Sequence, residues 1–458
     1  MVSLLELQRK YGLVTAICMV VGTVIGSGVF FKAQTILALT GGDLPMGILA
    51  WALGGSIMLI CSLAFASMAT RYEKINGLVD YAEATVGGGY AYFVGWFSAT
   101  IYAPTLTSVL AWLSARYTLV FLASVNPAMQ VDPTAGPECM VLTLVYLCLA
   151  YGVNALGPRL AGKIQVSATV VKLIPLGLLA VVGTVYGLRH GILQENFAAA
   201  AVAPSSDRPL FAAVVSTAFA YEGWIVTTSI NAELKDGKKN LPRALILGAV
   251  IVVAVYIAYY IGVAGGAPTR QLIDQGAAVA FTSVFGRFFG NILNLFVAIS
   301  CLGTTNGMML GCVRGLYAVA ARGQGPSPRR FASVDRETNV PANSAVIGLL
   351  VCAFWFLYYY FSQLSGRPEQ WLGFLVYDSS ELPVVSLYAL YLPIFIMFMV
   401  RARDLGILRR WVVPLLACLG CCFMIAASIY AHGMGNVYYL IMFAVIMAVG
   451  MVFYRRRA

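Results

Sequence analysis

The chain has 458 residues, of which 60% are hydrophobic and only 11% are charged, and its mean hydropathy is +0.82. Soluble domains carry about 25% charged residues, so this composition excludes an ordinary soluble protein and indicates an integral membrane protein. The formal net charge of +11 comes from basic residues in short connections between apolar stretches, a distribution typical of the positive-inside rule and not of nucleic-acid binding.

The ten cysteines lie mostly inside apolar stretches, where we interpret them as small buried hydrophobic residues. Their spacing shows neither a disulfide framework nor a metal motif, so we expect no cofactor and no metal. The first residues, MVSLLELQRKYG, lack the basic, apolar and small-residue order of a signal peptide, and we expect no cleaved leader.

Apolar stretches long enough to cross a bilayer recur along the whole chain. A hydrocarbon core of about 30 Å needs roughly 20 apolar residues per helix. Twelve stretches meet this length, at 12–39, 45–69, 88–122, 139–156, 164–187, 210–232, 243–266, 285–320, 343–361, 374–399, 412–431 and 436–454. Connections on the side of the termini hold 22 Lys and Arg residues against 7 on the other side. We therefore predict a multi-pass protein of the plasma membrane with both termini in the cytoplasm. The sequence contains no Asn-x-Ser/Thr sequon, which fits a bacterial inner membrane.

The first and sixth stretches carry residues that weaken a helix near its middle. The first contains VGTVIGSGVFF (Val21–Phe31), with the sequence GSG at 26–28, and the sixth contains FAYEGW (Phe219–Trp224). Glycine lowers helix stability by about 1 kcal/mol per residue, and each peptide group left unpaired in lipid costs several kcal/mol. Such breaks persist only where they line a polar cavity, so we predict one at mid-membrane.

The chemistry of a broken helix suggests what the cavity would bind. Amides freed at a half-helix N-terminus suit an anion, and freed carbonyls suit a cation, so together they fit the carboxylate and ammonium of an amino acid. The alternative is that small residues such as Gly22 and Gly26 only allow close helix packing. Because the two breaks lie five spans apart, an odd number, they predict two repeats of opposite topology, as in inverted-repeat transporters.

Four segments resemble the amino acid–polyamine–organocation superfamily, in particular its L-amino-acid transporter branch. They are GTVIGSGVFF, FAYEGW, INAELKDGKKNLPRA (Ile230–Ala244) and NGLVDYAEATVGGGYAYFVGW (Asn76–Trp96). The resemblance implies an all-α membrane protein of twelve transmembrane helices in a single domain, 1–458. It implies a LeuT-like 5+5 inverted repeat, about 12–187 and 210–399, with discontinuous first and sixth helices, peripheral helices at about 412–454, and alternating access.

The resemblance also implies roles for particular residues. The substrate carboxylate would meet backbone amides at 26–28, helped by the Ser27 hydroxyl, the ammonium would meet carbonyls on both broken helices, and Phe219 would close over the substrate. The implied substrate-binding residues are Val24, Ile25, Gly26, Ser27, Gly28, Phe219, Ala220, Glu222, Gly223, Trp224, Ile225 and Cys301. Phe219, Lys172 and Tyr256 are the candidate gating or coupling residues.

The chain departs from the family pattern at two places. Members that take larger substrates carry a polar residue after the tryptophan of the sixth span, where this chain has Ile225. Members that pair with a glycoprotein use a cysteine in the outer loop after the third span, whereas 122–138 contains none and Cys139 begins the next span. We therefore expect small substrates and no covalent partner subunit.

Lys172 lies inside the fifth span, and a lysine at the centre of a lone helix costs at least about 2.5–3.5 kcal/mol. It must therefore face protein or water. In one interpretation its ammonium is a permanent tether for carbonyls freed in the first span, in the place of a sodium ion. In a second, burial disfavours the charged form and the residue loads and releases a proton. In a third, it only extends into an aqueous vestibule.

Other polar residues in the spans leave alternatives open. Glu222 could titrate, bind the substrate ammonium or face solvent, and Tyr256 could donate to the first break or serve in packing. Thr304 and Thr305 could coordinate sodium only if the Lys172 ammonium were absent. The sequence YDSSELP contains two acids that could line the access path or cap a helix, namely Asp378 and Glu381.

Our leading hypothesis is sodium-independent exchange of small neutral L-amino acids, such as alanine, serine and cysteine. A proton-coupled symporter using Lys172 is the first alternative, and an amino acid sensor is an alternative of another class. An enzyme is not expected, because the two histidines, His190 and His432, lie in predicted outer loops and no catalytic cluster falls within a span. The expected partners are the amino acid substrate and the lipid bilayer, without nucleic acid.

Overall fold

The computed structural model describes residues 9, 11–72, 77–126, 128–198, 202–335 and 337–454, and at positions 27, 156, 158, 159 and 232 it describes the backbone only. Within these ranges the regular elements are helices, apart from one isolated bridge between Tyr11 and Leu234. Twelve helical segments are long and apolar enough to cross a membrane. Ten of them coincide with the predicted stretches to within about four residues at each end, so the predicted all-α membrane architecture is confirmed. The seventh span begins six residues before its predicted start, at Gly237, because its helix continues into the polar connection, and the tenth begins eight residues after its predicted start, at Leu382, because Asp378 and Ser380 form a turn ahead of the helix.

The spans follow one another along the chain, several of them built from more than one helical piece. Span one consists of α1 (Leu13–Val24) and α2 (Ser27–Leu39), and span two is α3 (Leu44–Ala69). Span three consists of α5 (Gly88–Phe97), η1 (Ser98–Tyr102) and α6 (Ala103–Val125), and span four is α7 (Pro137–Leu156). Spans five to eight are α8 (Pro158–Leu178) with η2 (Leu179–Gly183) and α9 (Thr184–Arg189), α11 (Pro209–Ala220) with η3 (Trp224–Glu233), α12 (Gly237–Gly266), and α15 (Arg287–Ala320). Spans nine to twelve are α17 (Ala342–Tyr359) with η4 (Tyr360–Leu364), α19 (Leu382–Arg401), η5 (Leu408–Val412) with α20 (Val413–His432), and α21 (Met434–Val452).

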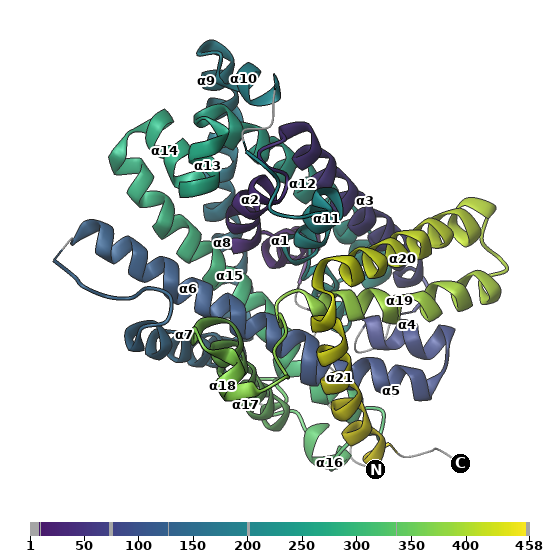
Figure 1. Ribbon diagram of the computed structural model, residues 1–458. Coiled ribbons are helices and arrows are strands. Elements are labelled where there is room, and N and C mark those ends of the chain that lie inside the picture. Colours follow the sequence, from purple (N-terminus) through teal and green to yellow (C-terminus); the bar gives the residue numbers. More distant parts are fainter. Residues whose placement is uncertain are drawn as a thin grey trace.

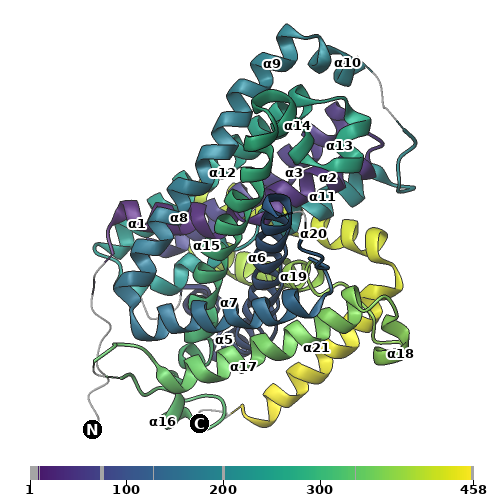
Figure 2. The same cartoon turned by 90° about the vertical axis from the view of Figure 1, so that its left-hand side faces the viewer.

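Short helices lie in the connections and mark the two membrane faces. They are α4 (Gly77–Thr85), α10 (Ile192–Ala198), α13 (Thr269–Gln275), α14 (Ala277–Phe285), α16 (Pro328–Phe331) and α18 (Pro368–Leu372). In Figure 2, α10, α13 and α18 lie toward the right-hand side and α16 toward the lower left, as alternating connections require. We name these the α10 face, where the first span ends, and the α16 face, where it begins.

Local sequence explains where several spans begin. The carboxylate of Asp43 accepts a hydrogen bond from the backbone amide of Met46 at 2.8 Å and so caps the start of α3. Pro137 and Pro209 occupy the first positions of α7 and α11, where a missing amide proton costs nothing. Within the spans, helical hydrogen bonds satisfy the peptide groups that lipid cannot.

Burial separates the spans at the centre of the molecule from those at its edge. In the sixth span, α11 with η3, 83% of the most apolar window is buried inside the protein, whereas in the twelfth span, α21, only 11% is. Figure 1 accordingly shows α11 beside α1 and α2 in the middle of the bundle and α21 along its outside. The sixth span is therefore core structure, and α21 presents most of its apolar surface to lipid.

The first and sixth spans are discontinuous, as predicted. Helix α1 ends at Val24 and α2 begins at Ser27, and the intervening Gly26 has φ −130° and ψ −143°, far from helical values. Helix α11 ends at Ala220, and the chain resumes as the 3-10 helix η3 only after Gly223, whose φ is +105°. A side chain at that φ would be strained, so glycine is what allows the second interruption.

Candidate substrate site between the interrupted helices

A cavity with an empty volume of about 290 Å³ lies between the two interruptions. Its walls come from both broken spans and from α6 and α15, and the lining residues are Thr23, Val24, Gly26, Gly28, Leu106, Leu110, Phe219, Glu222, Gly223, Thr304 and Met308. Six of the predicted substrate-binding residues thus lie around one cavity. The two helix interruptions, almost 200 positions apart in the sequence, both line this cavity.

The start of α2 offers unpaired backbone donors to this cavity. Gly26 is the N-cap of α2, and no side chain caps the helix there, so the first-turn amides lack helical partners. Gly28 also brings two backbones together, because a Cβ at that position would lie 2.7 Å from the Ala220 Cα atom. The amides and the positive end of the α2 dipole can accommodate an anion. The side chain of Ser27 lies outside the described residues.

Lys172 on α8 is fully buried and contacts the carbonyls freed by the first interruption. Its Nζ donates to the carbonyl oxygens of Gly22 at 2.7 Å and Ile25 at 2.5 Å. It also donates to the Thr304 hydroxyl at 3.1 Å. An ammonium has three protons, and three acceptors surround it. The charge of Lys172 is therefore fully hydrogen-bonded at the end of α1, where the helix dipole favours a cation.

Tyr256 on α12 connects the two interruptions directly. Its hydroxyl lies 3.0 Å from the carbonyl oxygen of Val24 and 3.0 Å from that of Ala220, the last residues of α1 and α11. The ring is buried and packs against the rings of Trp51 and Tyr221. One donor is thus shared between the two helix ends.

The glycines around the interruptions are required for different structural reasons. A Cβ on Gly22 would lie 2.2 Å from the Thr169 hydroxyl oxygen, so this glycine allows α1 to approach α8 closely. A Cβ on Gly223 would lie 2.8 Å from the Thr23 carbonyl oxygen, and that residue also has a positive φ. Gly22 therefore fits the packing interpretation, whereas Gly223 belongs to the break itself.

Glu222 lies in the second interruption and is 5% exposed. Its Oε1 atom accepts hydrogen bonds from the Tyr102 hydroxyl at 2.5 Å and from the Gly223 amide at 3.0 Å. The carboxyl group therefore lies in a wall of the cavity and does not extend into bulk solvent. Tyr102, at the end of η1, received no functional prediction from the sequence.

A buried ion pair covers the site toward the α10 face. The ammonium of Lys32 on α2 pairs with Glu381 at the start of α19 and lies 5.5 Å from the centre of the Phe219 ring. The Ser216 hydroxyl of α11 lies 3.5 Å from Glu381 Oε1, and the His432 Nε2 of α20 lies 3.0 Å from Glu381 Oε2. These contacts tie four spans together beside Phe219.

The two acids of YDSSELP therefore have different surroundings. Glu381 is the N-cap residue of α19, but its side chain makes no capping hydrogen bond and pairs with Lys32 instead. Asp378 Oδ1 instead accepts hydrogen bonds from the amide and hydroxyl of Ser380, at 2.7 and 2.6 Å, which fixes the local turn before α19.

Ion pairs also close the molecule toward the α16 face. Arg314 near the end of α15 pairs with Glu233, the last residue of η3, and both side chains are buried. Arg322 pairs with Asp80 and lies 3.2 Å from Glu83, both on α4. Ion pairs therefore lie on either side of the cavity.

Several residues predicted for the site lie beside the cavity rather than in its wall. Ile25 contributes its carbonyl to Lys172, and Ala220 packs against Gly28. Trp224 is buried against the rings of Phe65 and Tyr391. Ile225 lines a different cavity, and Cys301 is buried within α15.

The lining also includes residues that the sequence did not single out. Thr23, Leu106, Leu110 and Met308 are apolar or weakly polar residues inside long apolar spans, and nothing in their local sequence distinguishes them from lipid-facing positions. Thr304 had been named only as a sodium ligand. These walls make the cavity apolar around the two polar helix ends, which suits a small zwitterion with a short side chain.

The sequence is similar to a family model over nearly its full length and to individual proteins over about three quarters of it or more. Residues 11–453 match the family model described as "Amino acid permease". The serine/threonine exchanger SteT of Bacillus subtilis (strain 168) is 29% identical over 415 residues, which cover 89% of this chain and 87% of that protein. The Asc-type amino acid transporter 1 of Mus musculus is 31% identical over 356 residues, 76% of this chain and 63% of the transporter.

A third relative, the b(0,+)-type amino acid transporter 1 of Mus musculus, is 28% identical over 345 residues, which cover 74% of this chain and 68% of the transporter. The chain that resembles these proteins has twelve helices long and apolar enough to cross a membrane, with a cavity between the two interrupted spans. The match of 11–453 to the family model covers more than half of the chain. The chain therefore belongs to the amino acid permease family, whose members are membrane transporters and not enzymes.

Proposed function

We propose that this protein exchanges small neutral L-amino acids, such as alanine, serine and cysteine, across the plasma membrane without sodium. The observation that carries the proposal is the cavity between two interrupted helices, with free amides on one side and helix C-terminal carbonyls on the other. The substrate carboxylate would bind the amides at 26–28, and its ammonium would bind carbonyls at the ends of α1 and α11. Alternating access would then expose this site to each face in turn.

The position of Lys172 supports independence of sodium. Its ammonium already uses the carbonyls of Gly22 and Ile25 and the hydroxyl of Thr304. These oxygens are the kind of ligand that a sodium ion would need, and a second cation a few ångströms away would be repelled. The Thr305 hydroxyl instead donates to the Cys301 carbonyl at 2.8 Å within α15. Lys172 thus supports the tether interpretation.

The preference for small substrates follows from the walls. Phe219 and Met308 limit the cavity, and Glu222 and Tyr102 close the side toward the α16 face. The relative that is named a serine/threonine exchanger acts on small amino acids, which agrees with this reading. Cys139, the only cysteine near the connection after the third span, is fully buried, which supports a carrier without a covalent partner subunit.

The arrangement in the membrane is part of the proposal. The basic connections favour a cytoplasmic α16 face with both termini on that side. The two interruptions, in the first and sixth spans, support inverted repeats at about 12–187 and 210–399 in one domain. Rocking of the broken helices against their neighbours would break the Lys32–Glu381 pair on one side and the Arg314–Glu233 pair on the other.

Transport into proteoliposomes tests the proposal. Purified protein is reconstituted, and uptake of radiolabelled L-serine is measured into vesicles that are empty or preloaded with serine, with each common amino acid as competitor. Exchange predicts uptake only into preloaded vesicles, unchanged when sodium is replaced by choline or when a pH gradient is imposed. Accumulation in empty vesicles driven by external acid would establish the proton-coupled alternative. Binding without uptake under any condition would indicate a sensor.

A further inference from the structure

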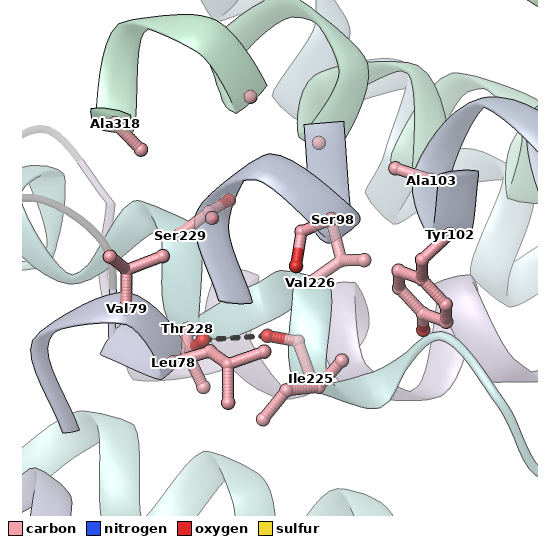
Figure 3. A pocket seen from close by; sticks show the side chains of 13 residues that line it. Leu78, Val79, Ser98, Tyr102, Ala103, Ile225, Val226, Thr228, Ser229 and Ala318 are labelled. Carbon is pink, nitrogen blue, oxygen red and sulfur yellow. Dashed lines mark hydrogen bonds between the residues drawn. The ribbon is translucent and has the colours of Figure 1, made fainter. Parts of the chain in front are cut away.

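A second cavity, with an empty volume of about 440 Å³, lies between α4, η1, η3 and α15 (Figure 3). Most of the side chains around it are small or aliphatic, such as Leu78, Val79 and Val226. The hydroxyls of Ser98 and Thr228 add polar groups to the wall, and the Thr228 hydroxyl donates to the Ile225 carbonyl at 2.7 Å. Such a lining suits hydrocarbon more than a charged group.

The second cavity lies next to the substrate cavity, on its side toward the α16 face. Along α15 the substrate cavity is lined by Thr304 and Met308, and the second cavity by Gly311 and Gly315. At a rise of 1.5 Å per residue, Gly311 lies only about 4.5 Å beyond Met308 along the helix axis. The two spaces are therefore neighbours on one face of one helix.

A hydrogen-bonded pair of side chains joins the wall of one cavity to the wall of the other. Tyr102 lines the second cavity and Glu222 lines the substrate cavity. The Tyr102 hydroxyl donates to Glu222 Oε1 at 2.5 Å, and the Gly223 amide donates to the same oxygen at 3.0 Å. Figure 3 shows Tyr102 at the end of the second cavity opposite Ala318. The ring and the carboxyl group thus separate the two spaces, and both side chains are at most 5% exposed.

We propose that the Tyr102–Glu222 pair is a partition that limits the size of the substrate side chain. With the pair in place, a bound amino acid has only the smaller cavity for its side chain. Without the Tyr102 ring, the side chain of a large neutral amino acid, such as leucine or phenylalanine, would extend from the substrate site into the aliphatic second cavity. This inference rests on the proposed function, because it assigns the size limit of that same site.

The physical reason for a size limit is steric and electrostatic together. A branched or aromatic side chain reaching past Glu222 would displace the Tyr102 ring and leave a buried carboxyl group without its hydroxyl donor, a penalty that opposes binding. Discrimination in a hydrophobic pocket amounts to about 10- to 200-fold per methylene group. Opening the partition is therefore expected to improve the binding of leucine relative to that of serine by at least about tenfold.

The test compares substrate preference between variants in proteoliposomes. Tyr102→Ala removes the partition, and Tyr102→Leu removes its hydroxyl and part of its volume in case the alanine variant does not fold. Val226→Ala is the matched control, because it enlarges the second cavity without touching the partition. For each protein, inhibition of L-serine exchange by L-alanine, L-leucine and L-phenylalanine gives a preference ratio that does not depend on the amount of active protein.

The expected result is that wild type and Val226→Ala strongly prefer serine and alanine. In the Tyr102 variants, the preference for leucine or phenylalanine relative to serine should rise at least about tenfold. A folded Tyr102 variant with the wild-type ratio would overturn the inference while leaving the exchange function intact. Equal inhibition of wild type by leucine and serine would overturn it as well. Failure of wild type to exchange any amino acid would instead reject the proposed function, and the size limit with it.

Discussion

Replacement of Lys172 by methionine tests the tether at the first interruption. Methionine is similar in length and apolar, so it fills the buried space but supplies no donors to Gly22, Ile25 and Thr304. A hydrogen bond that involves a charged group contributes about 1.5–3 kcal/mol. Loss of the two bonds to carbonyls should therefore cost about 3–6 kcal/mol in the conformation that forms the site. Because each 1.4 kcal/mol is tenfold, serine exchange should fall at least about 100-fold.

The assay is serine exchange into preloaded proteoliposomes, normalised to reconstituted protein, with thermal unfolding in detergent to verify folding. Lys163→Ala is the matched control, since Lys163 lies on the same helix with an exposed side chain, and its exchange should equal that of wild type. If Lys172→Met exchanged serine within about twofold of wild type, the ammonium would not be holding the broken helix, and the reasoning from its three acceptors would be refuted.

Three further substitutions test other parts of the account. Tyr256→Phe removes the donor shared by the two helix ends and should lower serine exchange about tenfold, the effect of one lost hydrogen bond. Tyr259→Phe is its control, because the buried Tyr259 hydroxyl has no partner among the described residues. Equal losses of exchange in both variants would contradict the assignment. Glu381→Gln leaves Lys32 without its buried carboxylate, a change that costs about 3–5 kcal/mol, so the unfolding midpoint in detergent should drop by several degrees; an unchanged midpoint would mean that the pair contributes little. Gly22→Ala places a Cβ 2.2 Å from a threonine hydroxyl on α8, so we expect poor folding yield by size-exclusion chromatography, and a wild-type yield would show that α1 and α8 can separate.

The positions of the spans and of the two interruptions could be predicted from the sequence, because both depend on local composition. Long apolar runs must be helical in lipid, and GSG in one span and a glycine beside a carboxylate in another are strong helix-weakening signals. The burial of Lys172 against the first break could also be anticipated, since a lysine inside an apolar span requires acceptors, and peptide carbonyls freed by a break are the nearest kind available.

Partners that are distant in the sequence could not be predicted. Lys32 and Glu381 are 349 positions apart, and each looks like an ordinary charged residue near the end of a span. Tyr102 ends the π-helical segment η1, two residues before Pro104, but nothing in this local sequence identifies Glu222, 120 positions away, as its partner. The direction of Ile225 depends on the positive φ of Gly223 and on the 3-10 winding of η3, which is why it lines the second cavity.

The most direct test of the central claim is an experimental structure of the reconstituted protein with bound L-serine or L-alanine. The account predicts density for the amino acid in the cavity between the interruptions. Its carboxylate should lie within hydrogen-bond distance of the backbone amides at 26–28, and its ammonium should face the carbonyl ends of α1 and α11. A bound amino acid held elsewhere, or continuous helical hydrogen bonding through 24–28 and 220–224, would contradict it.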